Sequence, residues 1–159
     1  MKRKLGLTAA LVCAMALVGY AQSKPDFSGT WTLDASKSEM GDMGGGGGGG
    51  RMGRGMMGGP ITITQTADAL TIEREGRNGP MKTTYKLDGT ETEVRAGRGA
   101  TGKAKAHWEG SNLVIETTAE GPNGSMTIKE TRSLAADGTM VVARETPRGA
   151  MKLVYTKQK

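Results

Sequence analysis

After its first twenty residues, the chain alternates apolar and polar residues in short segments, and tight turns separate most of them. Segment 61–66, for example, reads ITITQT. Side chains of a β-strand point alternately to the two faces of a sheet, so this period of two predicts a strand with one buried face. The turns carry Asp-Gly at 88–89 and 137–138 and Gly-Ser at 110–111. Turns this short connect antiparallel neighbours, which predicts a meander of strands.

Ten such segments follow one another, and no sustained helical period interrupts them. A long series of neighbouring antiparallel strands favours an up-and-down barrel, because closing the sheet removes its exposed edges. A two-sheet sandwich is the alternative, but it needs long crossover connections. We therefore predict an all-β fold, an up-and-down antiparallel β-barrel of about eight to ten strands. The expected strands are 27–33, 61–66, 70–74, 81–87, 92–94, 103–109, 113–119, 126–134, 140–146 and 151–156.

Residues 1–21 have the organisation of a secretory signal peptide. A basic start (KRK, 2–4) precedes an apolar run that is too short for a comfortable membrane span, and small residues precede a cleavage site after Ala21. We expect a single mature domain, 22–159, that is exported to the periplasm or secreted, without stable membrane insertion. The one cysteine, Cys13, lies in the leader, so the mature chain has no disulfide.

Charge and chemistry exclude several classes of function. Removing the leader lowers the formal net charge from +6 to +3, because the leader carries three basic and no acidic residues. That balance gives little support to a nucleic-acid partner, and we expect none. His107 is the only histidine, which disfavours a zinc site, and there is no nucleophile elbow. We therefore expect no enzymatic activity and no cofactor.

One break in composition interrupts the series of strands. Residues 41–59 contain twelve glycines and four methionines. Such a segment cannot bury enough apolar surface to offset its loss of conformational entropy, so we expect 41–60 to form a disordered Gly/Met-rich loop within the domain. Thioether sulfur is a soft ligand suited to Cu(I), which makes Cu(I) binding an alternative function. The methionines concerned are Met40, Met43, Met52, Met56 and Met57.

One face of each predicted strand forms the expected interior of the barrel. Its apolar and aromatic positions are Ile61, Ile63, Leu70, Ile72, Met81, Tyr85, Leu87, Val94, Ala104, Ala106, Trp108, Leu113, Ile115, Met126, Ile128, Met140, Val142, Met151, Leu153 and Tyr155. Polar residues on the same face are Gln65, Arg74, Thr83, Thr117, Glu130, Arg132 and Arg144. Buried charge is costly unless it is paired. These residues therefore lie either near strand ends, at the barrel mouth, or around a cavity that holds water or a polar ligand.

Segment 27–33 (FSGTWTL) resembles the opening strand of the lipocalin and fatty-acid-binding-protein superfamily. There a Gly-x-Trp motif starts the barrel and the tryptophan closes its base. The strand order and the ending 153–157 (LVYTK) are most similar to the fatty-acid-binding branch. The chain also resembles small exported bacterial lipocalin-like proteins of unassigned activity. The resemblance covers 26–157 and implies a barrel that holds a small, mainly apolar or amphipathic ligand.

Two features of the fatty-acid-binding branch are missing here. The branch has a helical lid between its first two strands, where this chain has 41–59. It also anchors the ligand carboxylate with Arg-x-Tyr in its last strand, whereas Leu153 stands at the arginine position before Tyr155. We expect Arg132 or Arg144 to replace that arginine. The expected ligand-binding residues are Tyr85, Trp108, Arg132, Arg144 and Tyr155. The alternative is an envelope-associated structural barrel with a filled interior and no ligand.

Deleting residues 41–59 should leave the melting temperature of the mature protein nearly unchanged, because shortening a long flexible loop changes its closure entropy little. Thermal unfolding of both proteins, followed by circular dichroism, measures the effect. A large loss of stability would contradict the interpretation of this segment as a disordered loop.

Overall fold

The computed structural model describes residues 24–39, 59–76, 79–95, 101–121 and 124–159. They form one sheet of ten antiparallel strands, in the order β4-β3-β2-β1-β10-β9-β8-β7-β6-β5. The strands are β1 (Gly29–Leu33), β2 (Ile61–Gln65), β3 (Ala69–Gly76), β4 (Gly79–Lys86), β5 (Glu91–Arg95), β6 (Thr101–Glu109), β7 (Asn112–Gly121), β8 (Gly124–Leu134), β9 (Met140–Thr146) and β10 (Gly149–Lys157). The proposed signal peptide and nearly all of the Gly/Met-rich segment lie outside the described residues.

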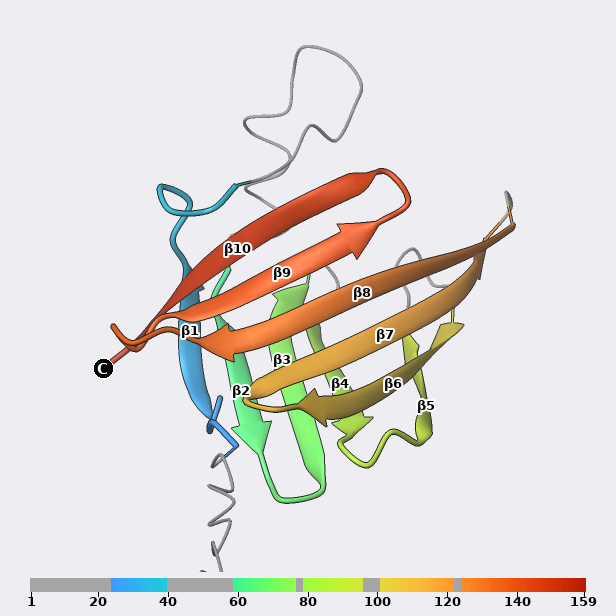
Figure 1. The fold of residues 1–159 in the computed structure, drawn as a ribbon, viewed down its shortest axis with the longest axis horizontal. Helices are drawn as coiled ribbons and strands as arrows, with labels where there is room; N and C mark the ends of the chain where they lie inside the picture. The colour runs from blue at the N-terminus through green and yellow to red at the C-terminus, as the bar shows by residue number, and fades with distance from the viewer. Residues whose placement is uncertain (1–23, 40–58, 77–78, 96–100, 122–123) are drawn as a thin grey trace, which may run out of the picture.

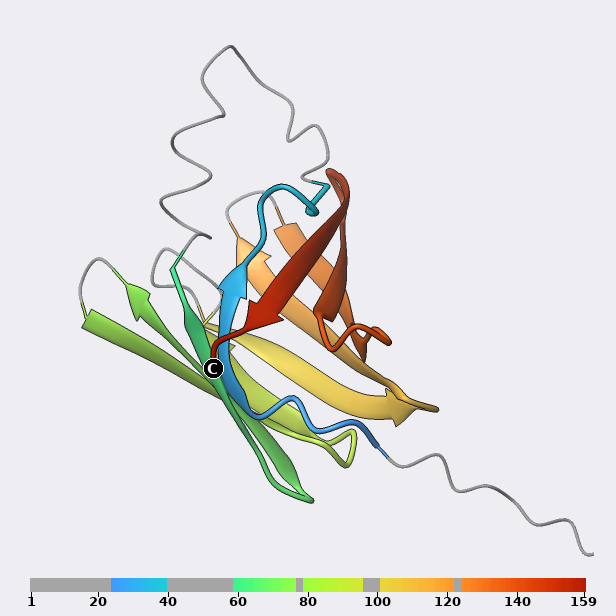
Figure 2. The same cartoon turned by 90° about the vertical axis from the view of Figure 1, so that its left-hand side faces the viewer.

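The sheet curls into a nearly closed barrel, which confirms the predicted all-β, up-and-down fold. Strands β6 to β10 form the near wall in Figure 1 and β1 to β4 lie behind them, while Figure 2 shows the two walls from the side. The first and last strands pair antiparallel, with Trp31 opposite Lys157 and Leu33 opposite Tyr155. The sheet ends at β4 and β5, where the Lys86 amide lies 3.5 Å from Thr92 Oγ1. In the described part of the chain, no helix is long and apolar enough to cross a membrane.

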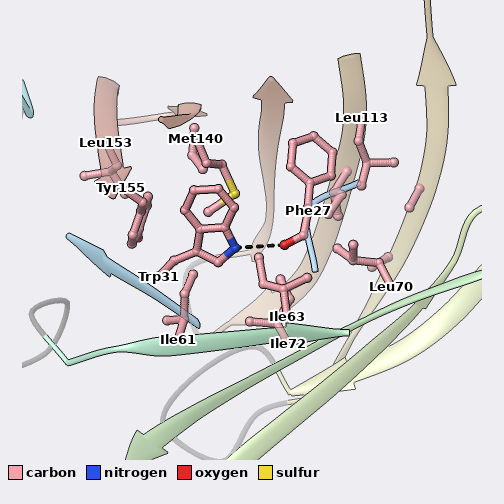
Figure 3. Packing of buried hydrophobic residues seen from close by; sticks show 14 of the residues in the cluster. Phe27, Trp31, Ile61, Ile63, Leu70, Ile72, Leu113, Met140, Leu153 and Tyr155 are labelled. Atoms are coloured by element: carbon pink, nitrogen blue, oxygen red, sulfur yellow. Dashed lines mark hydrogen bonds between the residues drawn. The ribbon is translucent and has the colours of Figure 1, made fainter. Parts of the chain in front are cut away.

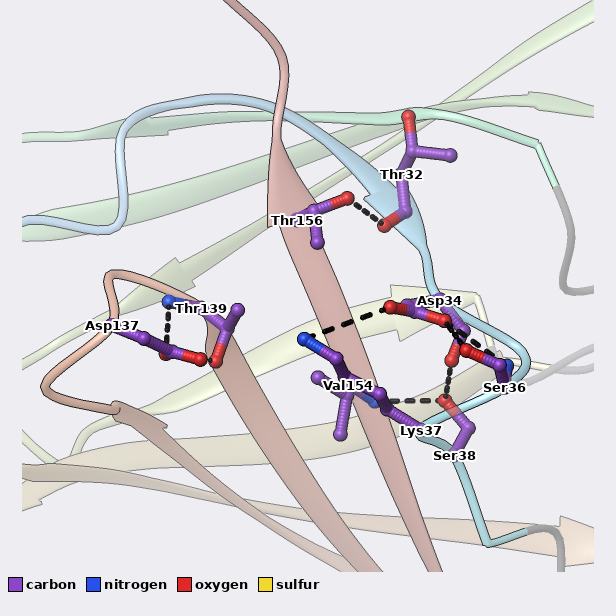
Figure 4. Close-up of polar contacts among 9 residues, drawn as sticks. All are labelled: Thr32, Asp34, Ser36, Lys37, Ser38, Asp137, Thr139, Val154 and Thr156. Atoms are coloured by element: carbon purple, nitrogen blue, oxygen red, sulfur yellow. Dashed lines mark hydrogen bonds and ion pairs between the residues drawn. The ribbon is translucent and has the colours of Figure 1, made fainter.

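Two of the tight turns share the sequence Asp-Gly-Thr and the same local bonding. In the β8–β9 turn, Asp137 Oδ1 accepts hydrogen bonds from the Thr139 amide at 3.0 Å and from its hydroxyl at 2.6 Å (Figure 4). Asp88 and Thr90 repeat this arrangement between β4 and β5. The intervening Gly138 has φ of 80°, a backbone conformation that residues with a Cβ rarely adopt. These contacts fix the register of the strands on either side of each turn.

The segment that follows β1 continues along the edge of β10. The Asp34 amide donates to the Val154 carbonyl at 2.8 Å, and the Val154 amide donates to Ser38 Oγ at 2.9 Å (Figure 4). Ser38 Oγ in turn donates to the Asp34 carbonyl at 2.7 Å. A bridge between Glu39 and Lys152 extends the pairing. This segment supplies partners for β10 beyond the short strand β1.

The apolar core is organised around Phe27 and Trp31, which are 0% and 1% exposed. The Trp31 indole Nε1 donates to the Phe27 carbonyl at 2.8 Å (Figure 3). Gln65 Oε1 accepts from the Phe27 amide at 3.0 Å, and Gln65 Nε2 donates to the Pro25 carbonyl at 3.0 Å. The inward-facing Gln65 therefore satisfies backbone groups of the chain that crosses this end of the barrel. We call it the Phe27 end.

Most of the expected apolar interior is buried. Tyr85, Trp108 and Ile128 are half-buried, and two further positions are exposed. Met81 and Met126 were expected inside but are 36% and 39% exposed. They lie directly after the β3–β4 and β7–β8 connections, opposite Arg74 and Ala119. Alternate connections of a meander lie at the same end of the barrel, so both methionines belong to the end opposite Phe27, which we call the mouth. Strand ends there extend beyond the layers of packed side chains.

Phe27→Ala should lower the free energy of unfolding by about 3–5 kcal/mol, because it removes a fully buried aromatic ring. Urea unfolding of residues 22–159 measures this change. Met126→Ala is the matched control, since that side chain is 39% exposed and its removal should cost only about 0.5 kcal/mol. Equal losses in the two variants would contradict the assignment of Phe27 to the core.

Candidate ligand site

The exposure of inward-facing side chains divides the barrel into two halves. Toward the Phe27 end, Leu70, Leu113 and Met140 are 0% exposed. Toward the mouth, Thr83, Thr117 and Ile128 are on the inward face of their strands yet remain only half-buried. Solvent reaches an inward-facing side chain only where the interior is not filled. The half next to the mouth is therefore less completely buried than the packed core around Phe27.

Three charged side chains meet where this half borders the packed core, with Arg132 level with Leu113. Glu130 and Arg132 alternate on β8, and the β8–β9 register places Arg144 directly opposite Glu130. Arg132 Nη2 donates to Glu130 Oε2 at 2.8 Å. Arg144 donates to the other carboxylate oxygen, Glu130 Oε1, from Nε at 2.9 Å and from Nη2. One carboxylate thus holds two guanidinium groups, and we call these three residues the charge cluster.

Charge pairing controls the protonation of the cluster. Burial by itself raises the pKa of Glu130, but the Arg132 and Arg144 guanidinium groups beside it outweigh burial and lower that pKa to about 2. Burial lowers the pKa of Arg144, and the Glu130 carboxylate raises it further than burial lowers it, so the net shift is upward. Glu130 is therefore ionised at neutral pH, and because arginine side chains remain charged in proteins, one carboxylate and two guanidinium groups give the cluster one net positive charge.

Arg132 is the member of the cluster with unsatisfied hydrogen-bonding capacity. The residue is 3% exposed. Its Nε and Nη1 atoms are buried and lack a hydrogen-bond partner among the described residues. Its neighbours in register are the apolar side chains Leu113 and Val142, which offer no acceptor. Leaving buried donors unpaired costs about 1–3 kcal/mol, and more when they are charged. The two nitrogen atoms therefore remain available to acceptor atoms, from water or from a ligand.

Two tyrosines lie near the cluster. Burial raises the pKa of the Tyr85 hydroxyl, and the Glu130 charge raises it further, against the opposing effect of the arginines. Burial also raises the pKa of Tyr155, while the charge of Arg132 opposes this shift. Both phenols therefore stay protonated at neutral pH and can donate hydrogen bonds. Tyr155 lies at one side of the packed group in Figure 3, next to Trp31 and Leu153.

The structure thus brings four of the five expected ligand-binding residues together: Tyr85, Arg132, Arg144 and Tyr155. The fifth, Trp108, lies at the Phe27 end. Its ring stacks on Phe27, with ring centroids 6.0 Å apart, and Lys24 Nζ lies 5.6 Å from its centroid. There Trp108 lines a surface pocket of about 260 Å³ together with Gln65 and Leu87.

The sequence left two interpretations of the polar residues on the inner face: a place at the barrel mouth, or a place inside the barrel. The structure shows examples of both. Arg74 is exposed near the end of β3, as expected for a residue at the mouth. Glu130, Arg132 and Arg144 lie within their strands and form the internal cluster. Glu130 is the member of the cluster that the sequence placed on the inner face but not among the expected ligand-binding residues. The sequence could have revealed its partner. In an antiparallel hairpin, residues at equal distances from the turn face each other, and residues 130 and 144 are each seven positions from Asp137.

The other residues considered for metal binding or catalysis do not belong to the charge cluster. The five methionines proposed for Cu(I), Met40, Met43, Met52, Met56 and Met57, lie outside the described residues. Within the described ranges, no group of three or more His, Cys, Asp or Glu residues is placed to hold a metal ion. His107 is on the outer face, 3.1 Å from Glu109 Oε1. Glu73 pairs with Lys82 at 2.8 Å, an exposed ion pair typical of a solvated surface.

Comparison with known proteins supports the fold. No family model matches the chain, and no curated protein matches it. Among solved structures, 174 chains match. One is described as "REP1-NXSQ fatty acid transporter", with a TM-score of 0.63 and 18% sequence identity, and the match covers 83% of this chain and 96% of that chain. At this identity the likeness shows the fold alone, and the nearly closed ten-stranded barrel fits a calycin-like fold.

Acidification should test the pairing of Glu130. Its pKa lies at about 2 in the folded protein, below the ordinary value of 4.5. A carboxylate with a lowered pKa stabilises the fold above its unfolded pKa, and this contribution is lost as pH falls through the folded pKa. Wild type should therefore lose about 3 kcal/mol between these two pH values through this group.

Urea unfolding at several pH values measures the loss. Glu130→Gln should have a shallower dependence on pH in this window, whereas Glu73→Gln, which removes an exposed carboxylate, should follow wild type. The same acid slope in wild type and Glu130→Gln would show that Glu130 is not paired as described.

Proposed function

We propose that the protein is an exported, lipocalin-like carrier that binds one small, mainly apolar molecule with an anionic group in the mouth half of the barrel. The observation that carries this proposal is Arg132, a buried cation with two nitrogen atoms that lack partners among the described residues. These two nitrogen atoms can donate hydrogen bonds to an anionic group and hold it in place. We therefore propose binding and not catalysis as their role.

The surroundings of Arg132 match the two parts of such a ligand. Ligand sites are mostly apolar, with a few polar groups that fix the orientation of the ligand. Ile115 and Met151 are 1% and 7% exposed, and they lie in register with Glu130 and Arg144 on the neighbouring strands. These side chains are already packed, so the apolar body of a ligand would extend from the cluster toward half-buried side chains nearer the mouth, such as Ile128, while its anionic group lies against the cluster. The net positive charge of the cluster attracts an anion.

The likeness to solved structures supports the same class of ligand. The structure described as a fatty acid transporter has the same fold as this chain. The Gly29-Thr30-Trp31 start and the order of strands fit membership of the lipocalin and fatty-acid-binding-protein superfamily, which we propose for this chain. In this protein the anchoring arginine is on β8 instead of β10, because Leu153 stands at the arginine position of the last strand.

Arg132→Met should weaken binding of an anionic amphiphile about tenfold to a hundredfold, because it removes charged hydrogen-bond donors that contribute roughly 1.5–3 kcal/mol. Calorimetric titration of the delipidated mature protein with decanoate measures this change. Arg148→Met is the matched control, since Arg148 is exposed in the β9–β10 turn, and it should bind like wild type. Native mass spectrometry of protein purified from its own compartment should show a bound mass of a few hundred daltons.

Two outcomes would contradict the proposal. Equal affinity of wild type and Arg132→Met for decanoate would show that Arg132 does not hold the anionic group. A bare protein mass combined with no titration signal from decanoate would favour a structural barrel whose interior holds only water.

A further inference from the structure

We propose that Glu130 determines the charge of the ligand and restricts the protein to molecules whose polar group carries a single negative charge. This inference rests on the proposed function and concerns the same space. In this view Glu130 sets the specificity of the site, because it pairs with one guanidinium group and leaves the other available to the ligand.

The hydrogen bonds show how Glu130 divides the two arginines. Arg144 donates from both Nε and Nη2 to Glu130 Oε1, so one edge of its guanidinium group is bound to the carboxylate. Arg132 gives only Nη2 to Glu130 and retains Nε and Nη1. The carboxylate therefore neutralises one arginine and leaves the other with donors for a ligand.

The charge balance leads to the same result. Side-chain exposures of 4%, 14% and 20% for Arg132, Glu130 and Arg144 place all three groups largely away from water. Uncompensated charge in such surroundings is unfavourable. A monoanion brings the cluster to zero net charge, whereas a neutral ligand leaves one positive charge and a dianion leaves one negative charge.

The other inward-facing residues of the mouth half change this balance little. Thr83, Thr117 and Ile128 are uncharged, and the tyrosines near the cluster remain protonated because burial raises the pKa of each. The charge of Arg74 acts against burial on the pKa of Tyr85 and Tyr155, but Arg74 is exposed at the mouth, where solvent screens much of that charge. Selection by charge therefore depends on the one acidic and two basic residues of the cluster.

A set of ligands with one chain length and different polar groups tests the inference. Decanoate and decyl sulfate carry one negative charge, decyl phosphate carries close to two at pH 8, and decanol carries none. Their dissociation constants are measured by calorimetric titration at a fixed salt concentration. Wild type should bind the two monoanions alike, and each at least about tenfold more tightly than the phosphate or the alcohol.

Variants should shift this preference in step with cluster charge. Glu130→Gln raises the net charge by one, so decyl phosphate should become the preferred ligand. Arg144→Gln lowers the net charge to zero, so the affinity for decanol should rise relative to the affinity for decanoate. The double variant Glu130→Gln/Arg144→Gln has the wild-type net charge and should regain the preference for a monoanion, which a purely structural role of Glu130 would not produce.

Each result separates the possibilities. Wild type that binds all four ligands alike, or variants that keep the wild-type order, would overturn the assignment of Glu130 while leaving ligand binding intact. Failure of wild type to bind any of the four would overturn the proposed function, and this inference with it. If Glu130→Gln does not fold, Arg144→Gln and the double variant decide the question, since they predict opposite preferences.

Discussion

The pairing of β1 with β10 is the constraint on which the rest of the structure depends. It joins the first and last strands of a meander, with Trp31 opposite Lys157 and Leu33 opposite Tyr155. Without this contact, the inner face of the sheet would be an exposed surface, and a cation such as Arg132 would be solvated. The pairing is short, and the Asp34–Ser38 segment extends it through further hydrogen bonds to Val154.

The register within the closed sheet determines the chemistry of the interior. The Asp137-Gly138-Thr139 turn aligns β8 with β9, and this alignment places Glu130 opposite Arg144. A shift of one residue would turn these side chains to the outer face. The position of the charge cluster therefore follows from a turn at the opposite end of the hairpin, near the packed core, which links the stability of the barrel to the geometry of the site.

The period of two and the Asp-Gly turns were sufficient to predict the strands, because both signals are local. The interior was harder to predict. Met81 and Met126 follow the same alternation as buried residues, but alternation does not show where a strand passes the end of the packed core, and both are exposed. Trp108 was placed on the correct face, yet its stacking on Phe27 depends on a segment that crosses the barrel end before β1. The pairing of Glu130 was harder to predict, because one of its partners, Arg144, is on the neighbouring strand. The two residues can be matched by counting outward from the turn only once the position of the turn is known.

Stability alone does not explain a charge cluster in a barrel of this size. Replacing buried ion pairs by apolar side chains of similar volume is often neutral or stabilising, because desolvation offsets much of the attraction between the charges. Apolar residues at these positions would continue the packing of Leu113 and Val142 toward the mouth. Arg132 adds to the cost, since its Nε and Nη1 atoms have no partner among the described residues. Such a cost is offset when a bound group supplies the missing acceptors. The unpaired donors of the charge cluster therefore support the proposed function, in which a bound group supplies those acceptors.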